Sequence, residues 1–297
     1  MAARAAVEAL LRERKLDRTL TSTLPERLDE DAVASLDVTV LDRALAGRVG
    51  LQDDAVAGGL PRGQVSEVVG PTSSGRTSVA WAALAAATRR GETVALIDTF
   101  DRFDPPTAHA CGIELSRLLW VRGQAVSKTS GAIDPAWLPG VRAVNGPGTF
   151  VERVIDRAIK SLNLVVQSGV CTLVVIDLID VPAQAVRRLP ASTWFRVERA
   201  IEGSDTAVLL LAAQPVARSA GGRSIVMDAG NREPGTGNQK SIPPDPGSRI
   251  PDPGVIWKGD HDRTRRVGGV RLRANINAAR WAHAQGVDLE TIVFNAV

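Results

Sequence analysis

One short stretch constrains the fold of this chain more than any other. It reads Gly-Pro-Thr-Ser-Ser-Gly-Arg-Thr over residues 70–77 and joins an apolar run at 64–69 to a run of small and apolar residues at 77–89. A glycine-rich loop between a strand and a helix turns backbone N–H groups toward phosphate oxygens, and the helix N-terminus favours negative charge. The stretch therefore predicts a phosphate-binding loop.

Every residue of this loop is a candidate nucleotide contact. The candidates are Gly70, Pro71, Thr72, Ser73, Ser74, Gly75, Arg76 and Thr77. The hydroxyl of Thr77 stands where such a loop ligates Mg²⁺, whereas Arg76 stands where lysine is usual. The loop predicts binding of ATP with Mg²⁺.

A second acidic position supports the magnesium site. The apolar run Leu173–Asp177 ends in a carboxylate, as expected of a buried strand that brings an acid to the shell of the metal ion. The alternative for Asp177 is a cap at the end of the strand. With the loop at 70–77 present, the metal role is favoured, so Thr77 and Asp177 are the predicted Mg²⁺ ligands.

Apolar and helical segments alternate through the middle of the chain. Strands are predicted at 64–69, 93–98, 118–122, 173–177 and 207–213, and helices at 77–89, 106–111, 150–166 and 194–201. Continuous apolar strands separated by helices are typical of a parallel sheet covered on both faces. The predicted fold class is α/β, with a mostly parallel sheet flanked by helices.

The two ends of the chain and two insertions differ from this pattern. Residues 1–50 form a predicted helical region, with an amphipathic helix at 2–16 and a second helix after Thr39. Residues 51–297 form the predicted core. An irregular insertion is expected at 123–148, and a flexible Gly/Pro-rich loop at 219–259. Strands at 270–277 and 291–294 follow, the first with a basic exposed face.

Charge is concentrated near the end of the chain. The formal net charge is +3, yet from Pro215 onward twelve basic residues face eight acidic ones. Such a bias fits a polyanion partner or an ordinary solvated surface, and charge alone leaves both open. No apolar run reaches the roughly 20 residues that span a bilayer, and the N-terminus lacks the pattern of a secretory signal. We therefore expect a cytoplasmic protein with no membrane contact.

Several motifs together resemble bacterial RecA over roughly residues 35–275. They are Gly-Gly-Leu-Pro-Arg-Gly at 58–63, Glu-Val-Val-Gly-Pro at 67–71, Ile97-Asp98, Phe103-Asp104-Pro105 and Gly112–Leu119. Among RecA relatives, Trp194-Phe195-Arg196 and the segment 214–219 are similar to the ImuA-like accessory proteins of damage-induced mutagenesis. The resemblance implies a RecA-type phosphate-loop core and a nucleoid-associated role in bacterial DNA repair.

The resemblance also shows departures that bear on hydrolysis. Phe100 falls at the position of the catalytic glutamate of the family, and Asp101 could substitute only if the loop shifts by one residue. Thr107 falls where a tyrosine stacks on adenine, while Asp104 and Gln214 remain to contact the base and the γ-phosphate. Phenylalanine cannot polarise water, and the arginine at 76 is bulkier than lysine. The expected result is weak nucleotide binding with slow or absent hydrolysis.

The resemblance further implies DNA contacts and partners. Candidate DNA-binding residues are Arg187 and Arg188 in a shortened first loop, and Arg218 and Arg223 after Gln214; the alternative is an insertion with incidental charge. The implied partners are RecA, a polymerase-like mutagenesis subunit, single-stranded DNA and the chain itself. Two rival functions stay open: a DNA-dependent ATPase or recombinase that forms nucleotide-gated filaments, and a nucleotide sensor that does not touch DNA.

Overall fold

The computed structural model describes residues 32–47, 58–123, 150–217, 219–228, 255–258, 266–278, 281 and 283–292. The predicted helix at 2–16 lies outside these residues, as do nearly all of the predicted insertion at 123–148 and residues 229–254 of the predicted loop. No helix in the described ranges is long and apolar enough to cross a membrane.

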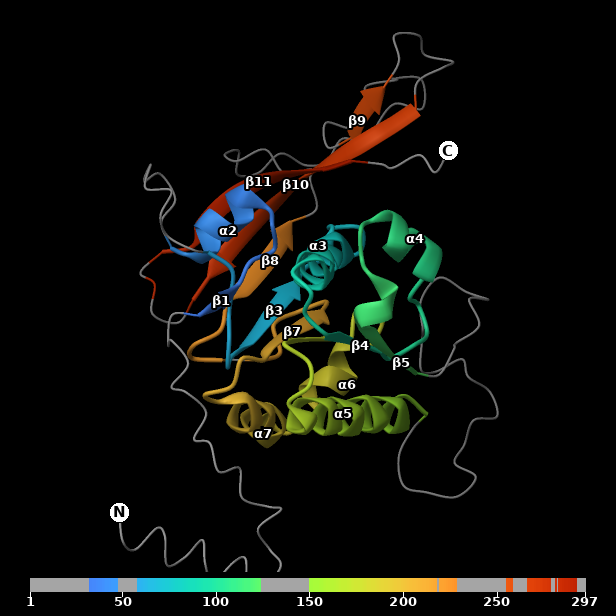
Figure 1. Cartoon of the computed structure of the whole chain (residues 1–297), viewed down its shortest axis with the longest axis vertical. Helices are drawn as coiled ribbons and strands as arrows, with labels where there is room; N and C mark the ends of the chain where they lie inside the picture. Colours follow the sequence, from blue (N-terminus) through green and yellow to red (C-terminus); the bar gives the residue numbers. More distant parts are fainter. Residues whose placement is uncertain are drawn as a thin grey trace, which may run out of the picture.

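A twisted nine-stranded sheet organises the described part of the chain (Figure 1). Its order is β11-β10-β8-β3-β7-β6-β4-β5, and β9 pairs with β10. The strands are β3 (Val65–Val69), β4 (Val94–Asp98), β5 (Leu118–Arg122), β6 (Leu173–Asp177), β7 (Ala207–Ala212), β8 (Ser224–Asp228), β9 (Val255–Lys258), β10 (Arg266–Asn277) and β11 (Gln285–Ile292). Strands β8 to β5 run parallel, whereas β9, β10 and β11 pair antiparallel. A separate pair joins β1 (Val33–Ala34) to β2 (Leu60–Pro61).

Helices cover both faces of the sheet. They are α2 (Thr39–Leu45), α3 (Arg76–Arg89), α4 (Pro105–Ala110), α5 (Phe150–Ser168), α6 (Ala183–Arg187) and α7 (Ala191–Ile201), with a 3₁₀ turn η2 at Leu115–Arg117. Figure 1 shows α3 and α4 on one face and α5 and α7 on the other. The predicted mostly parallel α/β fold is confirmed.

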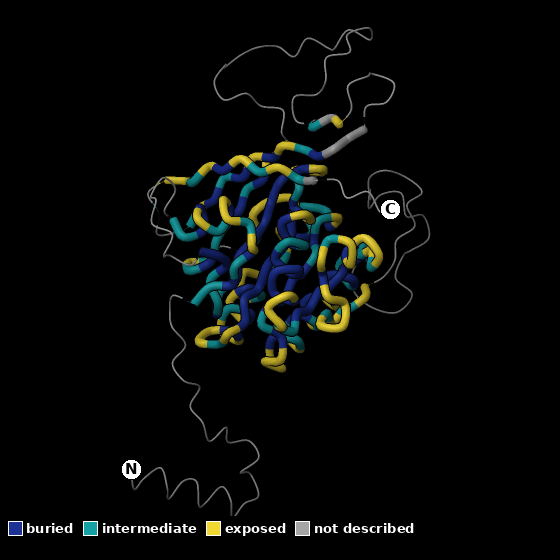
Figure 2. Tube along the Cα trace, turned by 45° about the horizontal axis from the view of Figure 1, so that its top comes forward, coloured by how far each residue is buried: buried dark blue, intermediate teal, exposed yellow. Residues whose placement is uncertain are grey.

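The alternation of side chains along the central strands creates two cores. On the α3 face, Val68, Val175 and Leu209 join one buried cluster. On the α5 face, Ile176 and Leu210 join the other. All residues of β3, β4 and β7 are buried, and Figure 2 shows burial concentrated along the central strands. Strands covered on both faces need no polar alternation, which explains the almost entirely apolar sequences of β4, β6 and β7.

The predicted loop at 219–259 is wrong at two places, because it contains β8 and β9. Ile225 and Met227 are fully buried on β8, which lies between β3 and β10 inside the sheet. The apolar run of β8 spans only residues 225–227, and glycines lie close before and after it, so the pattern is too short to predict a strand. The last strand also begins earlier than predicted, at Gln285 rather than Thr291.

The basic face predicted for the strand at 270–277 is largely neutralised. On β10, Arg271 and Arg273 form ion pairs with Glu290 and Asp288, directly across on β11. Cross-strand pairing of opposite charges therefore leaves this face with little excess positive charge.

Candidate functional site

The phosphate-binding loop joins the carboxyl end of β3 to the start of α3. Gly75, with a left-handed φ of 85°, caps the helix. A side chain at Gly75 would place its Cβ 2.3 Å from Cδ1 of Leu272, and one at Gly70 would lie 2.4 Å from the carbonyl oxygen of Met227. Both glycines are therefore required by the close approach of β8 and β10.

The loop offers groups suited to a phosphate. Pro71, Thr72 and Ser73 are exposed at the N-terminal end of α3, and so is Thr77. The hydroxyl of Ser74 is buried and has no hydrogen-bond partner. An unpaired buried hydroxyl beside a helix N-terminus fits an incoming anion, because a ligand oxygen would satisfy it.

Arg76 does not extend freely into this loop. Its side chain is only 5% exposed, and its Nη1 donates a hydrogen bond of 2.9 Å to the carbonyl oxygen of Ala212, at the end of β7. Burial lowers the pKa of the guanidinium, while the carboxylates of Asp177 and Asp180 raise it. The positive charge predicted to hold phosphate is thus bound to protein groups at the carboxyl edge of the sheet.

Asp177 lies at the same edge, at the end of β6. Its Oδ1 accepts a 2.8 Å hydrogen bond from the N–H of Ile179, so it does cap the turn that follows the strand. Burial, with Asp98 and Asp180 adding to it, raises the pKa of Asp177 to about 7. In the described ranges no cluster of three or more His, Cys, Asp or Glu side chains could hold a metal. A magnesium ion there would depend on Thr77, Asp177, ligand oxygens and water.

Asp98 fixes the loop that carries Phe100, at the position of the family's catalytic glutamate. Its Oδ1 accepts from the N–H of Arg102, and its Oδ2 accepts from the N–H of Phe103 and from Nε1 of Trp120. The side chain is 2% exposed. Three hydrogen bonds to one buried carboxylate give residues 99–103 a defined path.

Neither Phe100 nor Asp101 offers a free base at the catalytic position. Phe100 is 3% exposed and packs into the α5-side core. Asp101 accepts two hydrogen bonds from Arg122, at 2.9 and 2.7 Å, and this contact lowers its pKa. A carboxylate held by a guanidinium is a poor proton acceptor.

The residues predicted near the nucleotide base contact one another. Asp104 caps α4 and accepts from both the N–H and the hydroxyl of Thr107. Beside them, Trp81, Phe103 and Trp120 form an aromatic group with ring centroids 6.1 and 5.2 Å apart. Phe103 therefore packs between the two tryptophans, next to the predicted base contacts.

The residues predicted to contact the γ-phosphate or DNA differ in their surroundings, because some are bound to other protein groups and one is largely exposed. Arg187 on α6 donates to Oε1 of Gln214, so two predicted residues from different segments meet. Arg188 lies 3.4 Å from Glu152 and is 73% exposed. Arg223 donates to the carbonyl of Leu45 and lies over a tryptophan ring at position 281, 5.0 Å from its centroid. Arg218 lies outside the described residues.

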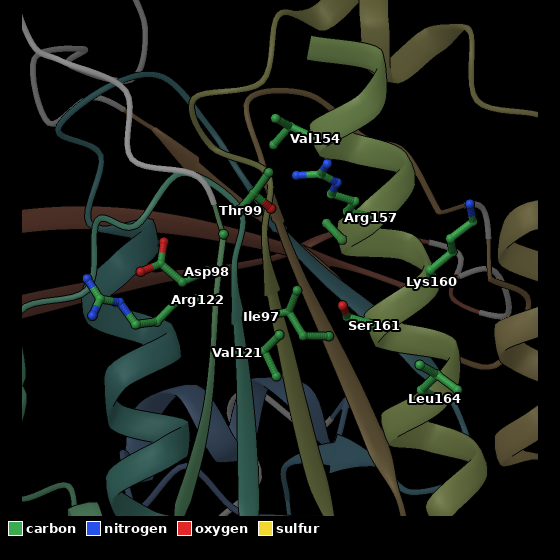
Figure 3. A pocket seen from close by; sticks show the side chains of 12 residues that line it. Ile97, Asp98, Thr99, Val121, Arg122, Val154, Arg157, Lys160, Ser161 and Leu164 are labelled. Carbon is green, nitrogen blue, oxygen red and sulfur yellow. The ribbon is translucent and has the colours of Figure 1, made fainter. Parts of the chain in front are cut away.

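A pocket of about 590 Å³ lies between β4, β5 and α5, and no loop residue from 70–77 lines it. Figure 3 shows Arg157 extending from α5 toward the strands, whereas Arg122 points away from the helix. The hydroxyl of Thr99 in its lining is buried without a partner. This pocket could not be predicted from the sequence, because its walls come from three separate segments.

The fold and the loop define a class: an α/β phosphate-loop protein with the loop at the carboxyl edge of a mostly parallel sheet. A family model described as the RecA N-terminal domain matches residues 21–130. RecA of Lactobacillus delbrueckii subsp. bulgaricus is 32% identical over 152 residues, which is 48% of this chain and 43% of that protein. RecA of Chlorobaculum tepidum is 40% identical over 93 residues, 31% of this chain and 26% of that protein.

The chain thus spans less than half the length of the curated relatives it matches. A crystal structure of the RadB recombinase aligns with 88% of this chain and 96% of its own, at 18% identity and a TM-score of 0.47. These matches show that part of the chain is similar in sequence to RecA. These matches do not distinguish the ImuA-like group from other RecA relatives.

Proposed function

We propose that this chain is a RecA-like accessory protein of bacterial DNA repair, which binds Mg²⁺–ATP weakly and hydrolyses it slowly or not at all. One observation carries the proposal: the phosphate loop is intact, but the guanidinium of Arg76 is bound to the carbonyl of Ala212 rather than free to meet a phosphate. Phosphoryl transfer depends on positioned cations and a positioned base. In this chain the cation Arg76 is bound to the carbonyl of Ala212, and the candidate base Asp101 is bound to Arg122.

The residues at the carboxyl edge divide the binding role among them. The N–H groups of the loop and the hydroxyl of Ser74 would hold phosphate oxygens, and Gln214 would lie toward the γ-phosphate. Thr77 and Asp177 would hold Mg²⁺, which neutralises phosphate charge when bound. Asp104 would accept a hydrogen bond from the adenine amine.

The finer role that we propose is that of an ImuA-like factor in damage-induced (SOS) translesion mutagenesis. On α7, Trp194 is buried while Phe195 is 63% exposed. An exposed aromatic side chain beside Arg196 suits a protein interface. We propose RecA and a polymerase-like mutagenesis subunit as partners in the cytoplasm near the nucleoid, with self-association as a further contact.

Single-stranded DNA is the proposed nucleic-acid partner. Arg188 and Arg218 would contact the phosphate backbone, and Arg187 donates a hydrogen bond to Gln214. Such contacts are independent of sequence and sensitive to salt.

The experiment is single-turnover hydrolysis of labelled ATP with Mg²⁺, with and without a poly-dT oligonucleotide. The Thr77→Ala, Asp177→Asn double variant serves as the control for contaminating ATPase, because it removes both proposed magnesium ligands. We expect the same near-background rate in both proteins. A DNA-stimulated rate that the control lacks would overturn the proposal in favour of a DNA-dependent recombinase. Substituting Glu at Phe100 is not a useful test, because it would bury a carboxylate in the core.

A further inference from the structure

The pocket between β4, β5 and α5 is separate from the phosphate loop. Figure 1 shows α5 on the face of the sheet opposite to α3, the helix that follows the loop. The pocket has a volume of about 590 Å³, within the range of pockets that hold small organic molecules. On the sheet side its wall is apolar, formed by Ile97 of β4 and Val121 of β5. A molecule bound there would lie away from residues 70–77.

Thr99 brings an unsatisfied hydroxyl group to this pocket. Its side chain is 1% exposed, and its Oγ1 has no hydrogen-bond partner. Figure 3 shows this side chain on the side of the strands that faces α5. A buried hydroxyl without a partner is costly, and a valine of nearly the same shape would avoid that cost. A ligand oxygen in the pocket would satisfy the hydroxyl.

Arg157 supplies a positive charge at the same end of the pocket. Figure 3 shows its guanidinium extending from α5 toward the strands, close to Thr99 in this view. Two other cations of the lining, Arg122 and Lys160, are already in ion pairs. Within the described ranges Arg157 has no such partner. Its guanidinium is therefore available to an anion.

The rest of the lining gives the pocket a polar end and an apolar end. Ser161 follows Arg157 by about one turn of α5, and Figure 3 shows its hydroxyl on the side of the strands. Leu164, a further turn along the helix, is 70% exposed at the opposite end. Asp98 also belongs to the lining, but its carboxylate already accepts three hydrogen bonds from protein groups. A ligand with one charged end and an apolar body matches this arrangement.

We propose that this pocket binds a small organic anion, whose charged group meets Arg157 and Thr99 and whose apolar body extends toward Leu164. A guanidinium offers a planar fork of donors that matches the oxygens of a carboxylate or a phosphate monoester. The hydroxyl of Thr99 adds a further donor to one of these oxygens. The site does not rest on the proposed function, because it shares no residue with the phosphate loop or with the proposed DNA contacts.

The test uses probes that share a phenyl group and differ in the charged end: phenylpropionate, phenylpropyl phosphate and the neutral phenylpropanol. Isothermal titration calorimetry measures the binding of each probe to the full chain, with and without excess Mg²⁺–ATP. Arg157→Gln removes the charge at an exposed position, and Thr99→Val removes the hydroxyl. The matched control is Arg196→Gln, which removes an exposed arginine of α7 that does not line this pocket.

We expect one of the two anions to bind about tenfold more tightly than phenylpropanol, and the tighter anion identifies the charged group. Arg157→Gln should weaken its binding about tenfold and Thr99→Val about threefold, whereas Arg196→Gln should bind it as the wild type does. Without a ligand, Thr99→Val should unfold at the same temperature as the wild type or at a higher one, because it loses only an unsatisfied group.

Four results would each overturn the site. They are no binding of either anion, equal binding of the anions and phenylpropanol, unchanged binding in Arg157→Gln, and displacement of the anion by Mg²⁺–ATP. Displacement would place the probe at the phosphate loop. A lower unfolding temperature in Thr99→Val would show that the protein itself satisfies the hydroxyl, and would remove Thr99 from the site.

Discussion

A guanidinium and an ammonium of equal charge act differently at position 76. The planar guanidinium of Arg76 reaches the carbonyl of Ala212 and stays there, within the field of Asp177 and Asp180. An ammonium on a flexible stem has no fixed fork of donors and can turn toward a phosphate instead. Arg76, which replaces the usual lysine of such loops, is thus bound to the protein at the carboxyl edge of the sheet.

Replacing Arg76 by lysine should therefore tighten nucleotide binding. We expect Arg76→Lys to bind Mg²⁺–ATP about fivefold more tightly, which corresponds to roughly 1 kcal/mol, as measured by titration with a fluorescent ATP analogue. Hydrolysis should stay at background, because Phe100 and Asp101 are unchanged. Arg89→Lys, an exposed arginine in the last turn of the same helix, is the control. Weaker binding by Arg76→Lys would mean that the arginine itself contacts the nucleotide.

Asp177 gives a prediction for pH. The pKa of its carboxyl group is raised from 3.8 to about 7 in the folded chain, so the folded state binds the proton more tightly than the unfolded state does. Its contribution to stability therefore falls as pH rises from about 4 to 7, and above that it is constant. Asp177→Asn keeps the acceptor for Ile179 and removes the ionisation.

We expect Asp177→Asn to be more stable than the wild type at pH 8 by about 1 kcal/mol, or on the order of 3 °C in Tm. The difference should shrink as pH is lowered toward 4, as followed by thermal unfolding without nucleotide. An Asn variant less stable than the wild type at pH 8 would show that the ionised carboxylate is stabilised by the folded chain.

At the scale of elements, the phosphate loop is shaped by its neighbours as well as by its own glycines. Gly75 faces Leu272 on β10, and Gly70 faces Met227 on β8. Both strands come more than 140 residues after the loop in the sequence. The position of the loop therefore depends on the correct pairing of β8 and β10.

The packing of Gly75 against Leu272 can be tested by a double-mutant cycle. Gly75→Ala should lower the free energy of unfolding by about 1–3 kcal/mol, because its Cβ would meet Leu272 at a left-handed φ. Leu272→Ala removes that contact, so the double variant should lose less stability than the sum of the two single variants. Urea unfolding gives the three values. Additive losses would contradict the proposed steric contact.

Elements could be predicted from the sequence where they are long or fully apolar. The strands at 118–122 and 173–177 match the structure, and the helix at 150–166 is two residues longer than predicted. Strand β8 could not be found, because its burial depends on β3 and β10 on either side of it. The site was only partly predictable for the same reason. The loop motif is local, whereas the carbonyl groups of Ala212 and Leu45, which accept from Arg76 and Arg223, lie more than 130 residues away from them in the chain.

At the scale of the whole molecule, the excess of basic residues after Pro215 does not form a single basic surface in the described part of the chain. Arg223 is half-buried and donates to the carbonyl of Leu45, and Arg271 and Arg273 pair with acids on β11. Among the predicted DNA contacts, Arg187 is bound to Gln214, and Arg188 lies at the surface near Glu152. Few cations are therefore placed for contact with DNA phosphates.

Binding to single-stranded DNA should accordingly depend only weakly on salt. With about two phosphate contacts, the slope of log affinity against log salt should be roughly −1.4, so affinity falls about sevenfold between 50 and 200 mM salt. Fluorescence anisotropy with labelled poly-dT measures the slope. Arg188→Gln should make it shallower by about 0.7, whereas Arg271→Gln, whose charge is already paired, should leave it unchanged. A slope steeper than about −4 would indicate six or more phosphate contacts, more than the proposed contacts Arg187, Arg188 and Arg218 supply, and would place the DNA on a different surface of the chain.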